Sequence, residues 1–219
     1  MGMRKPGYEP KQRDSNRRTR KCFIVISSEG KNKTEENYFK KFNSNKVKIH
    51  FAPGNATDPV KMVDALKRKC SDLGVKNDLG DRAYCLVDSD VNAQKDAQIA
   101  EADRIAAKYK TIDMKVIVSG PCFEEWFICH RNYSTKQYNS NEELLEDIEN
   151  IVPGYSKERE DLYEMLLDSQ DQAIQNAKKL EKHNIESGRK FHTSDFQPST
   201  EIYKIIEEIR AKNVDEKCP

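Results

Sequence analysis

Long apolar runs are missing from this sequence. Of its 219 residues, 36% are hydrophobic and 34% are charged. A helix needs about 18 consecutive apolar residues to span a bilayer, and no segment approaches that length. The N-terminus also lacks the apolar stretch of a secretory signal peptide. We therefore expect a soluble, cytoplasmic protein that does not bind a membrane.

Cysteine pairs with metal-binding spacing are missing as well. None of the six cysteines forms a Cys-x-x-Cys pair, which argues against a structural zinc site. Cys22 and Cys85 lie inside apolar segments, where reduced, buried thiols are the ordinary outcome. The cysteines therefore indicate neither disulfides nor zinc.

The chain also lacks an excess of charge of one sign, because its net charge is +1. This balance hides an asymmetry, since residues 1–21 hold eight Lys or Arg and two acidic residues. We expect residues 1–20 to form a flexible basic arm. Two interpretations of this arm stay open: a nucleic-acid contact, because cations displace phosphate counterions, or a solvated tail. Its candidate substrate-binding residues are Arg17, Arg18 and Arg20.

Strand and helix patterns alternate after the arm. Residues 21–27 form a nearly continuous apolar run, which is typical of a strand buried on both faces. Helical patterns separate this run from further strand patterns. The alternation predicts an α/β fold with a four-stranded, mainly parallel sheet flanked by helices. The expected strands are residues 21–27, 47–51, 83–88 and 114–118.

The rest of the chain has helical patterns. We expect an α/β core over residues 21–135 and a helical C-terminal part, residues 136–219, packed on that core. The expected helices of this part cover about residues 140–150, 157–183 and 199–212, and Ser199 or Thr200 is the expected cap of the last one.

Carboxylates follow two of the expected strands. Glu29 comes just after the first strand, and Asp88 and Asp90 close the third. Right-handed crossovers bring the carboxyl ends of parallel strands to one edge, where sites form in such sheets. Three acids that close repel one another unless a cation lies between them, and oxygen ligands suit a hard divalent ion. We therefore predict that Glu29, Asp88 and Asp90 bind Mg²⁺ or Mn²⁺.

Further polar residues fall near the same edge. Lys31 and Lys33 precede a helix, where cations and free backbone N–H groups favour phosphate, and Lys33 is also a candidate catalytic residue. Glu124 follows the fourth strand as a candidate metal ligand or general base. His130 is a candidate acid or phosphate contact, with a structural role as the alternative. Glu35 either supports the acids or complements a helix dipole.

Four motifs, in this order, resemble the RloB family. They are Glu29-Gly30-Lys31 with Thr34-Glu35-x-x-Tyr38-Phe39, Val87-Asp88-Ser89-Asp90, Pro121-Cys122-Phe123-Glu124-x-Trp126-x-x-x-His130, and Gln197-Pro198-Ser199-Thr200. The resemblance covers about residues 20–210. The family belongs to the TOPRIM-like superfamily of small parallel α/β domains. These domains carry a Glu after the first strand and an Asp-x-Asp after the third, and they use magnesium to cut, join or synthesise nucleic-acid backbones.

The resemblance implies a TOPRIM-like, magnesium-dependent endonuclease that cuts RNA, with tRNA as the narrower hypothesis, or DNA. It implies that Glu29 or Glu124 is the base and that Lys31, Lys33 and the arm hold the nucleic-acid backbone. RloB-like proteins are encoded beside restriction-modification and abortive-infection systems, often with an ABC-type ATPase. A role in anti-phage defence with such a partner is therefore expected.

Two other functions stay open. Residues 86–91 also resemble the phosphatase pattern in which the first Asp, here Asp88, attacks phosphate, although that pattern normally lies on the first strand of its fold. The third hypothesis is a non-catalytic sensor or regulator held by an ATPase partner.

Overall fold

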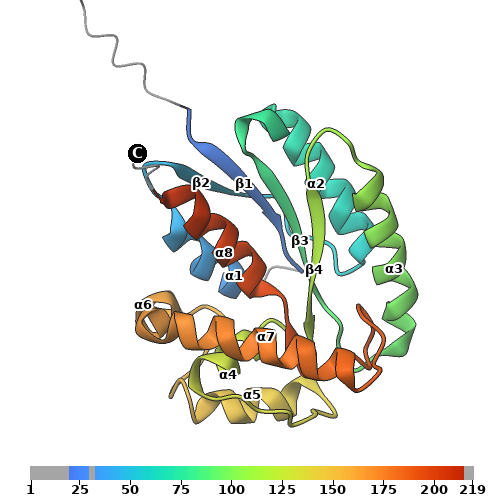
Figure 1. Ribbon diagram of the computed structural model, residues 1–219, viewed down its shortest axis with the longest axis vertical. Coiled ribbons are helices and arrows are strands. Elements are labelled where there is room, and N and C mark those ends of the chain that lie inside the picture. Colours follow the sequence, from blue (N-terminus) through green and yellow to red (C-terminus); the bar gives the residue numbers. More distant parts are fainter. Residues whose placement is uncertain (1–19, 30–32, 215–219) are drawn as a thin grey trace, which may run out of the picture.

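The computed structural model of this chain describes residues 20–29 and 33–214. In this part of the chain, helices cover both faces of a five-stranded sheet of order β2-β1-β3-β4-β5 (Figure 1). The strands are β1 (Cys22–Ser27), β2 (Val47–Phe51), β3 (Arg82–Asp88), β4 (Met114–Gly120) and β5 (Ser199–Thr200). The α-helices are α1 (Lys33–Phe39), α2 (Pro59–Leu73), α3 (Ala93–Lys108), α4 (Glu125–Arg131), α5 (Asn141–Glu149), α6 (Leu162–Leu166), α7 (Gln170–Glu186) and α8 (Ile202–Asn213). The expected α/β class is confirmed.

The register of the sheet brings the ends of β1 and β3 together. These strands are parallel neighbours, and Ser27 pairs with Cys85. On the other side of β3, Asp88 pairs with Ser119 of β4, again in parallel. The segments that follow β1, β3 and β4 therefore leave the sheet at the same edge, because parallel strands all have their carboxyl ends on one side.

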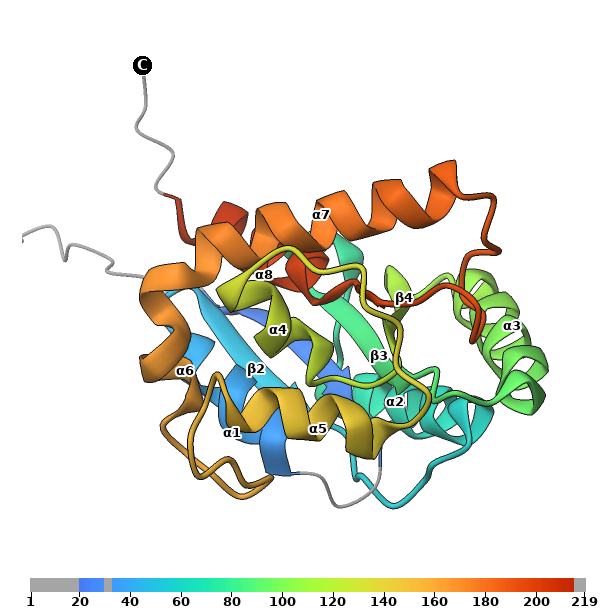
Figure 2. The same cartoon turned by 90° about the horizontal axis from the view of Figure 1, so that it is seen from below.

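The central strands β1, β3 and β4 are largely buried on both faces, so the sheet separates two hydrophobic cores. Because neighbouring side chains on a strand point to opposite faces, Val25 packs with α2 and α3 while Ile24 and Ile26 pack with the helices of the other face. Figure 2 shows α2 and α3 together on one side and α4, α7 and α8 gathered on the other. In residues 20–29 and 33–214, none of the helices combines the length and hydrophobicity that a membrane span requires.

The expected cap of the last helix is instead a fifth strand. Ser199 and Thr200 pair antiparallel with Gly120 and Ser119 at the end of β4. The Ser119 and Thr200 hydroxyls lie 3.0 Å apart, which adds a side-chain contact to this short pairing. The prediction of a helix from residue 199 was wrong because two residues of strand are too short to give a periodic pattern.

The helix expected over residues 157–183 is also divided. Residues 157–161 are irregular, α6 and a short 3-10 turn follow, and α7 begins at Gln170. Side chains of α1 hold the irregular stretch: Thr34 donates a hydrogen bond to the Lys157 carbonyl (2.9 Å), and the Asn37 amide donates to the Glu158 carbonyl (3.2 Å). These bonds satisfy carbonyls that a helix would otherwise pair with its own backbone.

Candidate acidic site at the carboxyl edge of the sheet

Glu29, Asp88 and Asp90 lie at one edge of the sheet in the structure. Glu29 follows β1, Asp88 ends β3, and the Asp88 backbone N–H donates a hydrogen bond to Glu29 Oε1 (3.2 Å). Asp90 has a positive φ of 49°, which Asp tolerates better than most residues. Its backbone N–H donates to the Pro121 carbonyl (2.8 Å), so the turn after β3 is tied to the segment after β4.

A lysine absent from the sequence-based site lies between two of these acids. The Lys95 ammonium is 2.5 Å from Glu29 Oε1 and 2.9 Å from Asp90 Oδ2, and only 6% of its side chain is exposed. Lys95 stands in the first turn of α3, whose N-cap Asn92 accepts a hydrogen bond from the Gln94 backbone. Because Glu29 Oε1 and Asp90 Oδ2 bind the same ammonium, these two oxygen atoms lie no farther apart than the sum of the two distances.

Asp88 is surrounded by other carboxylates. Burial raises its pKa well above the ordinary value, and the negative charges of Glu29, Glu35 and Glu124 raise it further. One favourable contact opposes this effect, because the Phe123 backbone N–H donates to Asp88 Oδ1 (2.8 Å). Burial also raises the pKa of Glu29, although the ammonium described above works in the opposite direction. The cluster therefore contains more carboxyl groups than its surroundings readily keep ionised.

Glu35 and Glu124 extend the cluster on the side of α1 and α4. Both residues are buried, with 3% exposed surface each. Burial, and then the neighbouring charge of Glu124, raise the pKa of Glu35 to about 8. Within the described residues Glu35 Oε2 has no hydrogen-bond partner. Glu124 Oε1 accepts a hydrogen bond from the Tyr155 hydroxyl (2.7 Å) and lies 3.9 Å from the Lys157 ammonium.

The other predicted catalytic residues contact different groups. Lys33 is exposed, and its ammonium lies 3.1 Å from Glu158 rather than on the acid cluster. His130 is buried on α4: its Nδ1 lies 2.9 Å from the Ser169 hydroxyl, and its ring meets Trp126 edge to face. Burial lowers the pKa of His130 to about 4. These contacts correspond to the structural alternative for His130.

The predicted basic residues are placed only in part. Arg17, Arg18 and Lys31 lie outside the described residues. Arg20 stands before β1, at the end of the strand opposite Glu29, and its guanidinium bonds both oxygens of the buried Asp81 (2.9 and 3.0 Å). The structure therefore places Arg20 away from the acids and in an ion pair that anchors the start of the sheet.

An open hollow gives access to the acids. Its volume is about 350 Å³. Two of the acids and the central ammonium line it, together with Thr57 before α2 and polar side chains of the turn and helix after β3. The lining residues are Glu29, Thr57, Asp90, Asn92, Gln94, Lys95 and Gln98.

The donor atoms of the cluster suit a hard divalent cation, since all of them are carboxylate oxygens. In the described part of the chain, however, no three metal-binding side chains surround one point. The Lys95 ammonium instead lies between Glu29 and Asp90. The cluster therefore offers suitable donor atoms, but in this arrangement the Lys95 ammonium is the cation that Glu29 and Asp90 bind. Among the described residues, Glu35 Oε2 is a carboxylate oxygen without a hydrogen-bond partner.

Comparison with protein-family models gives a match over most of the chain. Residues 24–209 match the model of the family described as RloB-like protein, which covers β1 to α8 and includes every acid of the cluster. No curated protein and no solved structure matches the chain.

Proposed function

Because this chain belongs to the RloB-like family, we propose that it is a magnesium-dependent endonuclease of TOPRIM type whose reaction takes place at the acid cluster. The observation that supports this proposal is the surplus of carboxylate at one point. Glu29, Glu35, Asp88, Asp90 and Glu124 act on one another electrostatically. The cations in contact with them are Lys95 and, at a longer distance, Lys157.

Glu29, Asp88 and Asp90 are the residues that would hold the metal. A bound divalent ion supplies a Lewis acid for the phosphate and lowers the pKa of a bound water. Asp88 is held for this role by the Phe123 backbone N–H, and Glu29 by the Asp88 backbone N–H. A backbone N–H thus helps to orient each carboxylate, and the Lys95 ammonium also binds Glu29.

Glu124 is the residue that would accept a proton from the attacking water. Glu124 is oriented by Tyr155. Glu35 has a pKa of about 8 because of its burial beside Glu124, so near neutral pH it is largely protonated and would supply a proton rather than accept one. Glu29, the other candidate base, is engaged by Lys95.

The substrate in this proposal is the phosphodiester backbone of RNA, with tRNA as the narrower hypothesis, or of DNA. The biological setting is bacterial defence against phage, with an ABC-type ATPase as partner, as expected for RloB-like proteins. Hydrolysis of small phosphate esters with Asp88 as nucleophile is less well supported. The Asp88 carboxyl group lies among like charges and already accepts a hydrogen bond from the Phe123 N–H. Asp88 is therefore a poor nucleophile.

The test is incubation of the purified chain with tRNA, plasmid and single-stranded DNA in Mg²⁺ or Mn²⁺, with EDTA as the metal-free arm. We expect cleavage by the wild type and at least 100-fold slower cleavage by Asp88→Asn, which keeps the acceptor for the Phe123 N–H but removes the charge. The matched control is Asp113→Asn, because Asp113 precedes β4 at the opposite edge of the sheet.

Equal cleavage by Asp88→Asn and wild type would overturn the proposal. So would the absence of cleavage with every substrate and metal, including in the presence of a co-purified ATPase partner. A stable complex with that partner and no cleavage would favour the regulatory alternative.

A further inference from the structure

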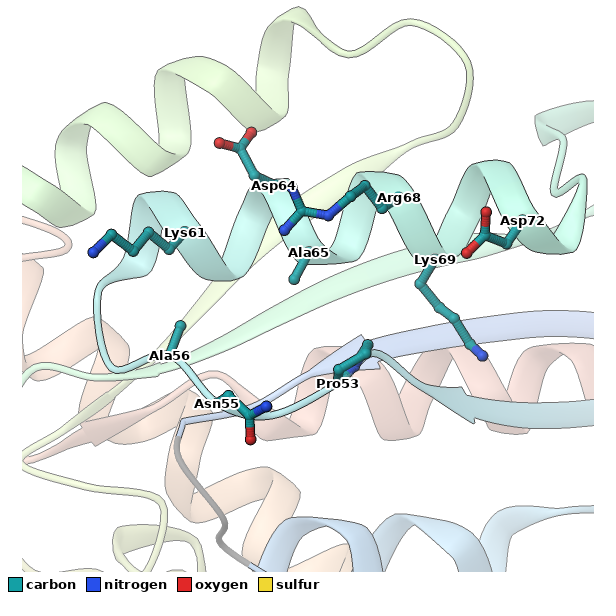
Figure 3. Close-up of a pocket in the computed structure, with 9 residues that line it drawn as sticks. All are labelled: Pro53, Asn55, Ala56, Lys61, Asp64, Ala65, Arg68, Lys69 and Asp72. Carbon is teal, nitrogen blue, oxygen red and sulfur yellow. The ribbon is translucent and has the colours of Figure 1, made fainter.

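We propose that the groove between α2 and the segment after β2 binds the phosphate backbone of a nucleic acid and leads it to the acid cluster. The groove has a volume of about 560 Å³. One wall is the solvent-facing side of α2, and the other is the chain that leaves β2 (Figure 3). This inference rests on the proposed function for its substrate class and adds a binding surface to it.

The α2 wall of the groove follows from the helical repeat. The residues at positions 62, 63, 66 and 70 are buried in the core. Lys61, Arg68 and Lys69 fall on the remaining side with the small Ala65 between them, which leaves room for a ligand. From Lys61 to Lys69 the helix advances about 12 Å, the length of about three to four nucleotide steps along one strand of B-form DNA.

The cations of this groove are available to a ligand. Among residues 20–29 and 33–214, no carboxylate forms an ion pair with Lys61, Arg68 or Lys69. Of the two acids on the same wall, Asp64 is engaged by Lys67 at 3.3 Å, and Asp72 lies at the far end of the groove. An anionic backbone would therefore replace water on three unpaired cations rather than break existing ion pairs.

The neighbouring edge of the sheet adds to the positive field. Burial lowers the pKa of His50 on β2, and the positive charges of Lys48 and Lys69 lower it further. Lys48 is exposed on the same strand. Because β2 is the outer strand of the sheet, this field faces solvent at the entrance to the groove.

The groove is joined to the acid cluster by the chain itself. Pro53, Asn55 and Ala56 line the groove, and the next residue, Thr57, lines the hollow that contains Glu29 and Lys95. A nucleic-acid strand bound along α2 would therefore reach the carboxylates by crossing this short segment. The acids alone would repel phosphate, so a cationic surface beside them supplies the attraction that the site lacks.

The test is nucleic-acid binding in EDTA, which keeps the substrate intact. Fluorescence anisotropy with labelled tRNA, single-stranded DNA and duplex DNA, each over a series of salt concentrations, compares the wild type with the double variant Arg68→Ala/Lys69→Ala. Alanine keeps the helix propensity of α2. We expect roughly ten-fold weaker binding and a salt slope reduced by about 1.5 for the preferred nucleic acid.

Two further variants make the test specific. Lys179→Ala removes an exposed lysine from α7, on the other face of the sheet, and should bind as the wild type does. Asp72→Asn removes a negative charge from the groove and should bind several-fold more tightly. Two results would overturn the proposed binding groove. One is an Arg68→Ala/Lys69→Ala variant with the same affinity and salt slope as the Lys179→Ala control. The other is an Asp72→Asn variant that binds no more tightly than the wild type.

The experiments distinguish failure of the proposed binding groove from failure of the proposed endonuclease reaction. Unchanged binding by the double variant together with metal-dependent cleavage by the wild type removes the groove and leaves the proposed reaction. Weakened binding by the double variant without cleavage in any metal leaves the groove and removes the reaction.

Discussion

Replacement of Lys95 by Met should destabilise the metal-free protein. Methionine keeps the apolar stem but removes the ammonium that bonds Glu29 and Asp90. Loss of one partner from a buried ion pair costs about 3–5 kcal/mol. The Glu29 side chain is 12% exposed and belongs to that class, whereas Asp90 is 36% exposed and its share is screened by solvent. We therefore expect a loss of about 2–4 kcal/mol in the free energy of unfolding at pH 7.

This loss should depend on pH in a defined direction. Without Lys95, the pKa of Glu29, which burial already raises, rises further above its value in the unfolded chain. A raised carboxylate pKa disfavours folding at neutral pH, and the penalty disappears as the pH falls below the pKa of the unfolded chain. The difference between Lys95→Met and wild type should thus be largest near pH 7–8 and shrink toward pH 4.

The assay is thermal unfolding in EDTA and in Mg²⁺, followed by circular dichroism. For a chain of this size, 2–4 kcal/mol corresponds to a fall in Tm of roughly 5–15 °C. Because a divalent ion would occupy the position of the ammonium, Mg²⁺ should raise the Tm of Lys95→Met more than that of the wild type. The control is Lys108→Met, an exposed lysine in the last turn of the same helix. A Lys95→Met protein as stable as wild type in EDTA, or one indifferent to Mg²⁺, would refute the reasoning.

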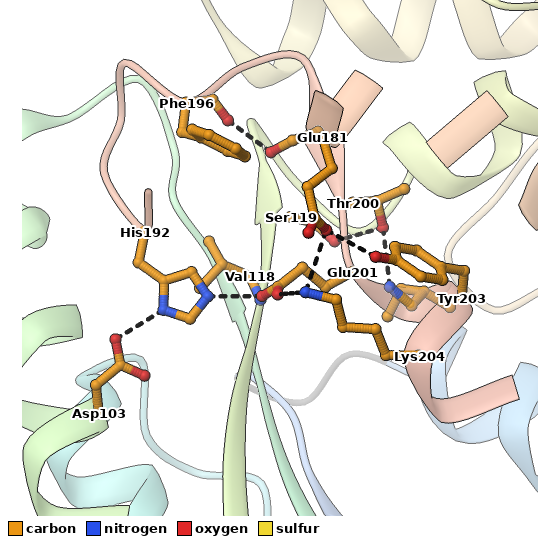
Figure 4. Close-up of polar contacts among 12 residues, drawn as sticks. Asp103, Val118, Ser119, Glu181, His192, Phe196, Thr200, Glu201, Tyr203 and Lys204 are labelled. Carbon is orange, nitrogen blue, oxygen red and sulfur yellow. Dashed lines mark hydrogen bonds and ion pairs between the residues drawn. The ribbon is translucent and has the colours of Figure 1, made fainter. Parts of the chain in front are cut away.

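Two further predictions concern the surroundings of β4. His192 bridges Asp103 and Glu201 (2.7 and 2.6 Å; Figure 4); burial opposes its charge, but the two carboxylates outweigh burial and raise its pKa to about 9. The stability that His192 gains from these two carboxylates is complete below the pKa of about 6.5 in the unfolded chain and is lost as the pH rises through 9. In urea unfolding, the free energy of unfolding of the wild type should therefore fall by about 3 kcal/mol over this range, and His192→Asn should abolish that fall. A His192→Asn variant with the same pH dependence as the wild type would contradict this assignment. Gly120→Ala would place a methyl group 3.1 Å from the hydroxyl of Ser89, the residue between Asp88 and Asp90 in the chain. We therefore expect about 1–3 kcal/mol of destabilisation and slower cleavage. A variant with wild-type Tm and cleavage rate would show that the turn accommodates the methyl group.

The parts of the site predicted from the sequence are those that strand ends determine. Glu29 follows β1 and Asp88 ends β3, and the parallel orientation of the strands places both at one edge whatever the side chains in between. Asp90 follows because it is two residues from Asp88. Their proximity also depends on β1 and β3 being neighbours, which the sequence did not specify and the structure shows.

The parts that were missed depend on side-chain reach or on partners distant in the sequence. Lys95 meets Glu29 across 66 residues, and its position in the first turn of α3 has no motif of its own. The pairing of Arg20 with Asp81 spans 61 residues and could not be distinguished in the sequence from one more charge of the basic arm. Strand β5 has only two residues, too few for a period-two pattern.

The charge distribution connects the two proposals. Carboxylates grouped as Glu29, Asp88 and Asp90 are cannot attract phosphate, and Lys95 neutralises them only in part. A nucleic acid would approach them only if cations nearby compensate for the repulsion. Lys61, Arg68 and Lys69 on α2, which form ion pairs with none of the described carboxylates, fulfil that condition without lying in the reaction site. The chain between them and Thr57 is short. Removal of the groove charges should therefore weaken binding of the substrate, whereas removal of the Asp88 charge should slow its cleavage once bound.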